Sequence, residues 1–185
     1  MTEAAGKLQE WGCSPYARGR IGHRLGGGLS MDLRWREGLG AAIDEIAAAA
    51  RVSHPDRLIE SNVVVVDRAV RCDLARIQQI ASNLLDNAIA HGWAVGLVAI
   101  RAETRAECFE IRVWNQGDPI APESIGRIFE PFWRRESDHS HDGLGLGLYV
   151  CTLITEVHGG SPTVSSSIER GTVFVARIPI SGPPD

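Results

Sequence analysis

Lysine is almost absent from this sequence, and its absence narrows the chemistry available to the protein. The 185 residues include 19 Lys and Arg residues, and Lys7 is the single lysine among them. Schiff-base catalysis and a phosphate loop of the Walker A type both need a positioned lysine, so we expect neither. Long apolar runs are lacking as well, since no stretch approaches the roughly 18 to 20 residues that a membrane-spanning helix needs.

Basic charge and paired cysteines are also scarce. The formal net charge is −4, which leaves no general basic surface to neutralise a nucleic-acid backbone. Residues 1–9 are polar and lack the apolar stretch of a secretory signal. No Cys-x-x-Cys pair occurs, so reduced structural thiols are favoured over a disulfide or zinc framework. We therefore expect a cytoplasmic protein that has no nucleic-acid partner and makes no membrane contact through this segment. The widely spaced cysteines are Cys13, Cys72, Cys108 and Cys151.

The chain divides into two regions by its patterning. Residues 1–40 contain three adjacent glycines, Gly26 to Gly28, which oppose a continuous helix. We interpret this region as an N-terminal appendage or linker. Residues 41–185 have the apolar patterning of one globular domain.

Periodicity in residues 41–185 predicts a mixture of helices and strands. Asp73 and Gly92 are typical capping residues at the two ends of one long helix. The predicted helices span 41–52, 74–91 and 146–158, with a short helical piece near 123–129. The predicted strands span 58–67, 69–72, 95–103, 108–114, 164–168 and 172–180. Because no repeated βαβ rhythm is present, we expect an α+β fold: a two-layer sandwich of a mixed sheet with helices on one face.

One side of the predicted helix 74–91 carries amides where a solvated face would carry charges. Gln79, Asn83 and Asn87 recur at positions i, i+4 and i+8, and we call these three residues the amide line. Asparagine is unfavourable inside a helix, so helix stability does not explain why asparagines stand at these positions. Carboxamide oxygens can coordinate a hard cation, and amide N–H groups can donate to phosphate oxygens. The alternative is a helix with incidental polar residues.

Two further segments point towards a ligand. The glycine-rich loop 142–148 opens directly into a helix, and a helix N-terminus favours anions. A flexible turn with packed leucines is the alternative there. At 113–120 a strand runs into a turn, where Asn115 could present its amide to a base edge and Gly117 could leave room for a flat ring. The aromatic segment 128–133, which we expect to lie in the core, precedes a polar stretch, 134–142, that could be a mobile lid.

In this order, the segments resemble the ATP-binding catalytic domain of bacterial sensor histidine kinases over about residues 41–182. The N box spans 79–88, the G1 box 115–120, the F box 129–132 and the G2 box 143–148, and Gly171-Thr172 forms a last glycine motif. The resemblance implies a Bergerat-type ATP-binding fold with a mobile ATP lid. It also implies membership of the superfamily that contains type II topoisomerases, the Hsp90 chaperone and mismatch-repair ATPases.

The resemblance implies ATP and Mg²⁺ as ligands and gives each box a role. Asn83 would bind Mg²⁺, Asn87 would contact the nucleotide beside it, and Gln79 would lie next to the transferred phosphoryl group. Asn115 would accept a hydrogen bond from the adenine amino group. Arg134 and Arg135 would be lid cations, with ordinary solvated arginines as the alternative. The other implied nucleotide contacts are His91, Gly117, Ile120, Phe132, Gly143, Leu144, Gly145, Leu146, Gly147, Leu148 and Thr172.

Three positions depart from the family pattern. Asn115 stands where an acidic residue reads adenine, Pro119 replaces the second glycine of the G1 box, and Ala90 stands where many members carry a lysine. An amide oxygen can still accept from the adenine amino group, although a neutral acceptor forms a weaker bond than a carboxylate. Two alternatives therefore stay open: a nucleotide-responsive, non-catalytic module (a pseudokinase), and a serine kinase like the anti-sigma-factor serine kinases of the same superfamily.

The phosphoacceptor of the family is not evident in this chain. His23 is the only histidine before residue 50, and segment 16–30 resembles the end of the second helix of a dimerisation hairpin, as in some phytochrome-like kinases. The resemblance thus implies phosphoryl transfer to a histidine on a dimerisation domain supplied elsewhere. It further implies a response regulator as partner and a homodimeric full-length kinase.

Overall fold

The computed structural model describes residues 30–63, 68–134 and 144–183. Three main helices occur in this part of the chain: α2 (Leu39–Ser53), α3 (Leu74–His91) and α5 (Gly147–Val157), with a short α4 (Pro122–Ile125). The described strands are β1 (Arg34–Arg36), β2 (Ile59–Val63), β3 (Val70–Cys72), β4 (Val98–Arg105), β5 (Cys108–Asn115), β6 (Ser161–Ser167) and β7 (Gly171–Pro179).

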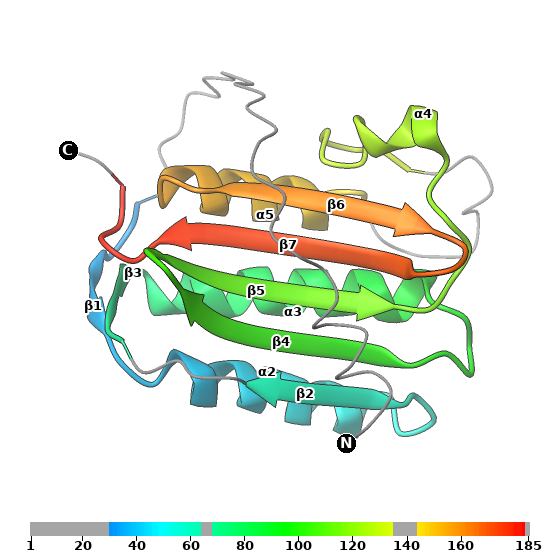
Figure 1. Ribbon diagram of the computed structural model, residues 1–185, viewed down its shortest axis with the longest axis horizontal. Coiled ribbons are helices and arrows are strands. Elements are labelled where there is room, and N and C mark those ends of the chain that lie inside the picture. Colours follow the sequence, from blue (N-terminus) through cyan, green and yellow to red (C-terminus); the bar gives the residue numbers. More distant parts are fainter. Residues whose placement is uncertain (1–29, 64–67, 135–143, 184–185) are drawn as a thin grey trace.

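Five of the strands form one mixed sheet in the order β2-β4-β5-β7-β6. β2 and β4 are parallel, and the other neighbours are antiparallel. Helices α2, α3 and α5 lie together on one face of this sheet (Figure 1). The predicted α+β class and the two-layer sandwich with helices on one face are confirmed.

The core lies between the helices and the sheet because side chains alternate across each strand. Ile100 on β4, Ile111 on β5 and Phe174 on β7 point into this layer and are almost fully buried. They pack against the apolar side of α3, which includes Ile80 and Leu84. This packing orients α3 so that its amide residues lie on another side of the helix.

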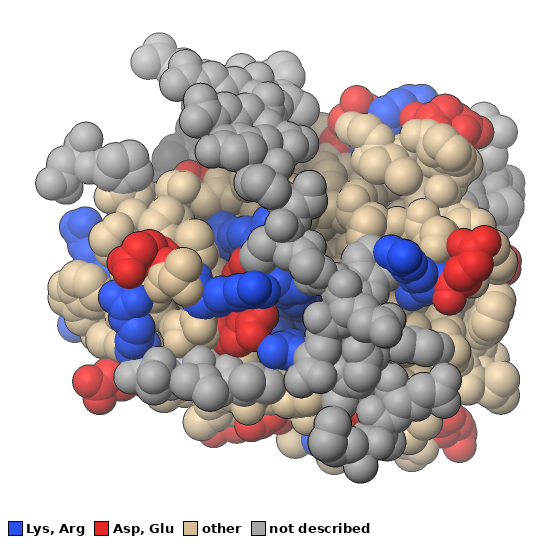
Figure 2. Space-filling model, in the orientation of Figure 1, with Lys and Arg blue, Asp and Glu red and all other residues tan. Residues whose placement is uncertain are grey.

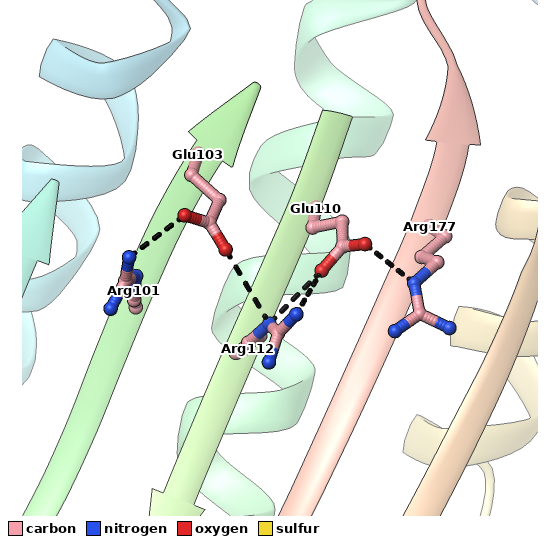
Figure 3. A network of polar contacts seen from close by, with 5 residues as sticks. All are labelled: Arg101, Glu103, Glu110, Arg112 and Arg177. Atoms are coloured by element: carbon pink, nitrogen blue, oxygen red, sulfur yellow. Dashed lines mark hydrogen bonds and ion pairs between the residues drawn. The ribbon is translucent and has the colours of Figure 1, made fainter. Parts of the chain in front are cut away.

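The opposite face of the sheet carries charged side chains in its centre. Figure 2 shows basic and acidic residues gathered side by side on this face. Figure 3 shows how five of them alternate in sign across β4, β5 and β7: Arg101, Glu103, Arg112, Glu110 and Arg177. The innermost members are Glu110 and Arg112, whose side chains are 4% and 5% exposed. Charges buried this deeply need partners of opposite sign, which the alternation supplies.

Part of the predicted N-terminal region packs on the domain that follows it. β1 pairs antiparallel with β3, so that Trp35 lies opposite Arg71, and Leu39 at the start of α2 is fully buried. Residues 34–40 therefore belong to the folded domain. Sequence patterning missed this strand because three residues with two arginines carry no strand signal without their pairing partner. Residues 1–29, which include His23, lie outside the described part of the chain.

The predicted elements otherwise differ from the structure at their ends. The single strand expected over 58–67 is described as Ile59–Val63, since 64–67 lie outside the described residues. The strand expected from residue 95 begins at Val98, because the chain first makes a turn in which Gly96 N–H donates to the Trp93 carbonyl.

Candidate active site

Helix α3 carries all three residues of the predicted amide line. It begins after Asp73, whose side chain accepts a hydrogen bond from the Arg76 N–H at 3.3 Å, as an N-cap residue does. It ends before Gly92, where an added Cβ would lie 2.7 Å from the Ala88 carbonyl oxygen. The bounds Leu74–His91 are the ones that the capping residues predicted. Gln79, Asn83 and Asn87 are all partly buried.

Asn83 joins α3 to the beginning of α5. Its amide nitrogen donates to the Gly147 carbonyl oxygen at 3.2 Å. The Asn83 amide also lies beside the thiol of Cys151 on α5. Burial raises the pKa of this thiol to about 12, and the hydrogen bond with Asn83 opposes that rise. Because the amide nitrogen is used in holding the two helices together, the amide oxygen is the Asn83 atom available to a ligand.

Gln79 has a partner one turn earlier on the same helix. Arg76 Nη1 donates to Gln79 Oε1 at 2.8 Å, so the side-chain oxygen of Gln79 is engaged and its NH₂ group remains as a donor. Arg76 is a functional candidate that the sequence reasoning missed, although its spacing of three residues from Gln79 is a recognisable helical pair.

A pocket opens between the C-terminal part of α3, the end of β5 and the start of β7. The predicted contacts that line it are Asn87, His91, Asn115, Ile120, Leu148 and Thr172. Its further lining residues, which the sequence reasoning did not assign to the site, are Asp118, Ile128, Trp133 and Phe174. The aromatic segment 128–133 was the available signal, but it was interpreted as core.

Asn115 is held at this pocket by the sheet. It is the last residue of β5, is 3% exposed, and lies opposite Val98 on β4 and Thr172 on β7. Close backbone packing surrounds it. An added Cβ at Gly171, whose φ is +73°, would lie 2.5 Å from the Asn115 carbonyl oxygen, so this position requires glycine.

Gly117 serves chain packing in this structure. A Cβ there would lie 2.8 Å from the His91 carbonyl oxygen and 3.0 Å from Asn115 Nδ2. Its missing side chain therefore lets the turn approach the end of α3. A contact of Gly117 with a flat ring stays a prediction.

The glycine loop and the F box contact each other through their backbones. Phe132 N–H donates to the Gly145 carbonyl oxygen at 3.2 Å, and a Cβ at Gly145 would lie 2.7 Å from the Trp133 carbonyl oxygen. The side chains of Phe132 and Leu144 are 69% and 72% exposed. The ring of Phe132 is thus placed outside the lining of the pocket, whereas its neighbour Trp133 is part of it.

The remaining predicted contacts divide between the loop and the residues not described. Leu146 immediately precedes α5 and Gly147 begins it, while Arg134 is exposed. Arg135 and Gly143 lie outside the described residues. Within the described ranges, no group of three or more His, Cys, Asp and Glu side chains could hold a metal ion. Every described helix is too short or too polar to cross a membrane.

His158 ties the end of α5 to the start of α3. The imidazole is fully buried, its Nδ1–H donates to the Ile154 carbonyl oxygen at 2.7 Å, and its Nε2 accepts from the Asp73 N–H at 3.1 Å. This pattern requires the neutral ring. Burial lowers the pKa of His158, which outweighs the opposing effects of the Ile154 carbonyl and the Asp73 carboxylate. The two helices that carry the amide line and the glycine loop are therefore joined at the other end of α5 as well.

Known proteins are similar to this chain in sequence and in structure. Sensor protein SrrB of Staphylococcus aureus is 32% identical over 109 residues, which make up 58% of this chain and 19% of SrrB. The chain thus spans about a fifth of the length of that curated relative. The structure of the catalytic domain of histidine kinase ThkA matches with a TM-score of 0.68 and 28% identity, over 83% of this chain and 97% of that one. The mycobacterial sensor histidine kinase MprB matches with a TM-score of 0.66 and 27% identity, over 78% of this chain and 96% of that one.

The family comparison agrees with the order of the boxes. The model described as "Histidine kinase-, DNA gyrase B-, and HSP90-like ATPase" matches residues 72–182. This range contains the amide line on α3, the pocket and the glycine loop, and it covers more than half of the chain. The predicted resemblance is confirmed: the chain belongs to the family of histidine kinase-, DNA gyrase B- and HSP90-like ATPases.

Proposed function

We propose that this domain binds ATP with Mg²⁺ and transfers the γ-phosphoryl group to a histidine on a dimerisation domain that is not evident in the chain. The observation that carries the proposal is the bond from Asn83 to Gly147, because it brings the amide line of α3 to the point where the glycine loop becomes α5. The base would lie in the pocket beside Asn115 and Thr172. The phosphates would extend towards the N-terminus of α5, whose backbone N–H groups favour anions.

The residues present fit one Mg²⁺ ion, which Asn83 would hold. Mg²⁺ keeps several waters and takes one or two protein ligands together with phosphate oxygens. Asn83 would hold it through the amide oxygen, because its nitrogen is engaged with Gly147. When bound, the ion supplies positive charge that offsets the charge on the transferring phosphoryl group.

Gln79 would orient the reacting groups. An amide cannot take a proton from water as a carboxylate can, so it is poorly suited to catalyse hydrolysis. With Oε1 held by Arg76, its NH₂ group can donate to the phosphoryl oxygens or to the acceptor. Positioning of this kind contributes much of the catalysis in phosphoryl transfer. These features favour a protein acceptor over water.

The partners follow from the same proposal. ThkA has been solved in complex with the response regulator protein TrrA, and that kinase is 27% identical to this chain with a TM-score of 0.65. We propose that a response regulator receives the phosphoryl group here too. We further propose that the whole kinase is a homodimer in the cytoplasm and has no nucleic-acid partner.

The first test is binding. A non-hydrolysable ATP analogue is titrated into the chain by calorimetry, with Mg²⁺ and with EDTA. We expect binding in both conditions and higher affinity with Mg²⁺, because the ion joins the phosphates to Asn83. Absence of binding in both conditions would refute the proposed function.

The second test separates the possible acceptors. Incubated alone with γ-labelled ATP, the chain should incorporate little or no label, and a cognate dimerisation hairpin fused in cis should acquire acid-labile phosphohistidine. Acid-labile label on the chain alone that is lost in His23→Gln would show instead that His23 is the acceptor. Acid-stable label on an added partner would indicate the serine-kinase alternative, and nucleotide binding without transfer to any acceptor would indicate the pseudokinase.

A further inference from the structure

Asn115 is the polar residue best placed to distinguish one purine from another. It stands at the end of β5, lines the pocket and is only 3% exposed. A carboxylate at this position could only accept hydrogen bonds, whereas a carboxamide offers both an accepting oxygen and a donating NH₂ group. We propose that Asn115 gives the site relaxed base selectivity, so that it takes 6-oxopurine nucleoside triphosphates as well as ATP. This inference rests on the proposed function and concerns the same pocket.

The surroundings of the amide allow either orientation. Rotation by half a turn exchanges an oxygen for an NH₂ group of similar size, and Nδ2 already has room because residue 117 is glycine. Among the described residues, none of the hydrogen bonds fixes the Asn115 carboxamide in one orientation. With the oxygen turned towards the base, the amide accepts from the 6-amino group of adenine. With the nitrogen turned towards it, the amide donates to the 6-oxo group of hypoxanthine or guanine.

The hydroxyl groups at this position are equally adaptable. The hydroxyl of Thr172 lies 2.7 Å from that of Ser166, and either can be the donor. Ser166 also accepts from the Ile120 N–H at 2.9 Å, which keeps the hydroxyl pair in place without fixing its direction. Thr172 can therefore donate to the base or accept from it.

The carboxylate of the pocket does not restore selectivity. Asp118 is the only carboxylate among the described lining residues, and it is exposed. Its Oδ1 accepts a hydrogen bond from Trp93 Nε1–H at 3.1 Å, and this bond holds the carboxylate at the exposed edge of the pocket. The buried polar lining beside the end of β5 is thus neutral, and no fixed charge there opposes a 6-oxo group.

The measurable consequence is a small ratio between the dissociation constants of inosine triphosphate and ATP. Inosine triphosphate is the cleanest probe, because it carries a 6-oxo group without the 2-amino group of guanine. When a buried site can match both bases, the large penalty for an unpaired polar group disappears. We expect inosine triphosphate to bind the wild type within about tenfold of ATP. In Asn115→Asp, two acceptors would face each other only in the inosine complex, so the ratio should rise by at least about tenfold.

Displacement of a ribose-labelled fluorescent ATP analogue, in the presence of Mg²⁺, measures both affinities for each protein. Asn62→Asp is the matched control, since it makes the same chemical change on β2 outside the pocket and should leave the ratio unchanged. A wild-type ratio above about tenfold would overturn the inference, whether or not the Asn115→Asp protein folds. An unchanged ratio in folded Asn115→Asp would overturn it as well. If no nucleotide displaces the analogue because the analogue itself does not bind, the proposed function fails and this inference fails with it.

Discussion

Replacing Glu110 with alanine is expected to destabilise the domain strongly, because this carboxylate is the centre of the charge network on the sheet face opposite the helices. Its Oε2 accepts from Arg112 at 2.6 Å and 3.0 Å, and its Oε1 accepts from Arg177 at 2.6 Å. The Glu110 and Arg112 side chains are 4% and 5% exposed, so solvent does little to screen them. Removal of the carboxylate takes away both short bonds to the Arg112 guanidinium, whose Nε also lies 3.8 Å from Glu103 Oε1.

The expected loss of stability follows from removing one partner of a buried ion pair while the other partner stays. Such a change costs about 3 to 5 kcal/mol, because the remaining charge stays buried without its partner. For a domain of 150–250 residues, each kcal/mol lowers Tm by about 2 to 4 °C, so the expected loss is about 6 to 20 °C. Glu107→Ala is the matched control. Its carboxylate pairs with Arg68 at 3.2 Å but is 83% exposed, and such surface pairs contribute about 1 kcal/mol or less.

Thermal unfolding followed by circular dichroism measures both variants. Glu110→Gln separates charge from shape, since it keeps the side-chain volume but cannot pair with either arginine as an anion. A Tm of Glu110→Ala within about 2 °C of that of Glu107→Ala would refute the reasoning, because it would mean that the network contributes no more than an exposed pair.

The network also predicts an acid-sensitive component of stability. Burial alone would raise the pKa of Glu110, but hydrogen bonds from Arg177 and Arg112 outweigh burial and hold this pKa below its ordinary value of 4.5. The ionised carboxylate therefore contributes its full stability above about pH 4.5, and this contribution is lost as the pH falls through the folded-state pKa. Glu110→Gln should lack this part of the pH dependence.

Three further outcomes are expected. Asn83→Ala should bind the ATP analogue with a smaller difference between Mg²⁺ and EDTA than the wild type, by calorimetry; an unchanged difference in the folded variant would contradict the metal assignment. Because the pKa of His158 is lowered from 6.5, the unfolded state takes up the proton first, so the free energy of unfolding should fall as the pH drops below about 6.5. His158→Gln should lack that slope in urea titrations, and equal slopes would show that the ring is not held neutral. Burial raises the pKa of Cys72 to about 11 and that of Cys151 to about 12, so mass spectrometry should find both thiols unmodified by iodoacetamide in the native state, and rapid alkylation of either would contradict their burial.

The sequence alone determined the features that depend on neighbouring residues. The bounds of α3 followed from Asp73 and Gly92, because capping acts within one helical turn. The patterning of residues 95–103 and 108–114 predicted the two strands β4 and β5. The order of the boxes predicted the family, and the amide line on α3 pointed to the ligand. The spacing of three residues between Arg76 and Gln79 is itself enough to predict their contact.

Only the tertiary structure decided what depends on residues distant in the chain. The strand at Arg34–Arg36 exists because β3 pairs with it, and the parallel β2–β4 pair needs the intervening α3 crossover. Trp133 and Asp118 enter the pocket only because the F box and the G1 turn lie over the ends of β5 and β7. The partners of Glu110 come from its own strand and from β7, 67 residues further along the chain. Periodicity within one segment carries no record of such pairings, because they are selected by the packing of the whole sheet against its helices.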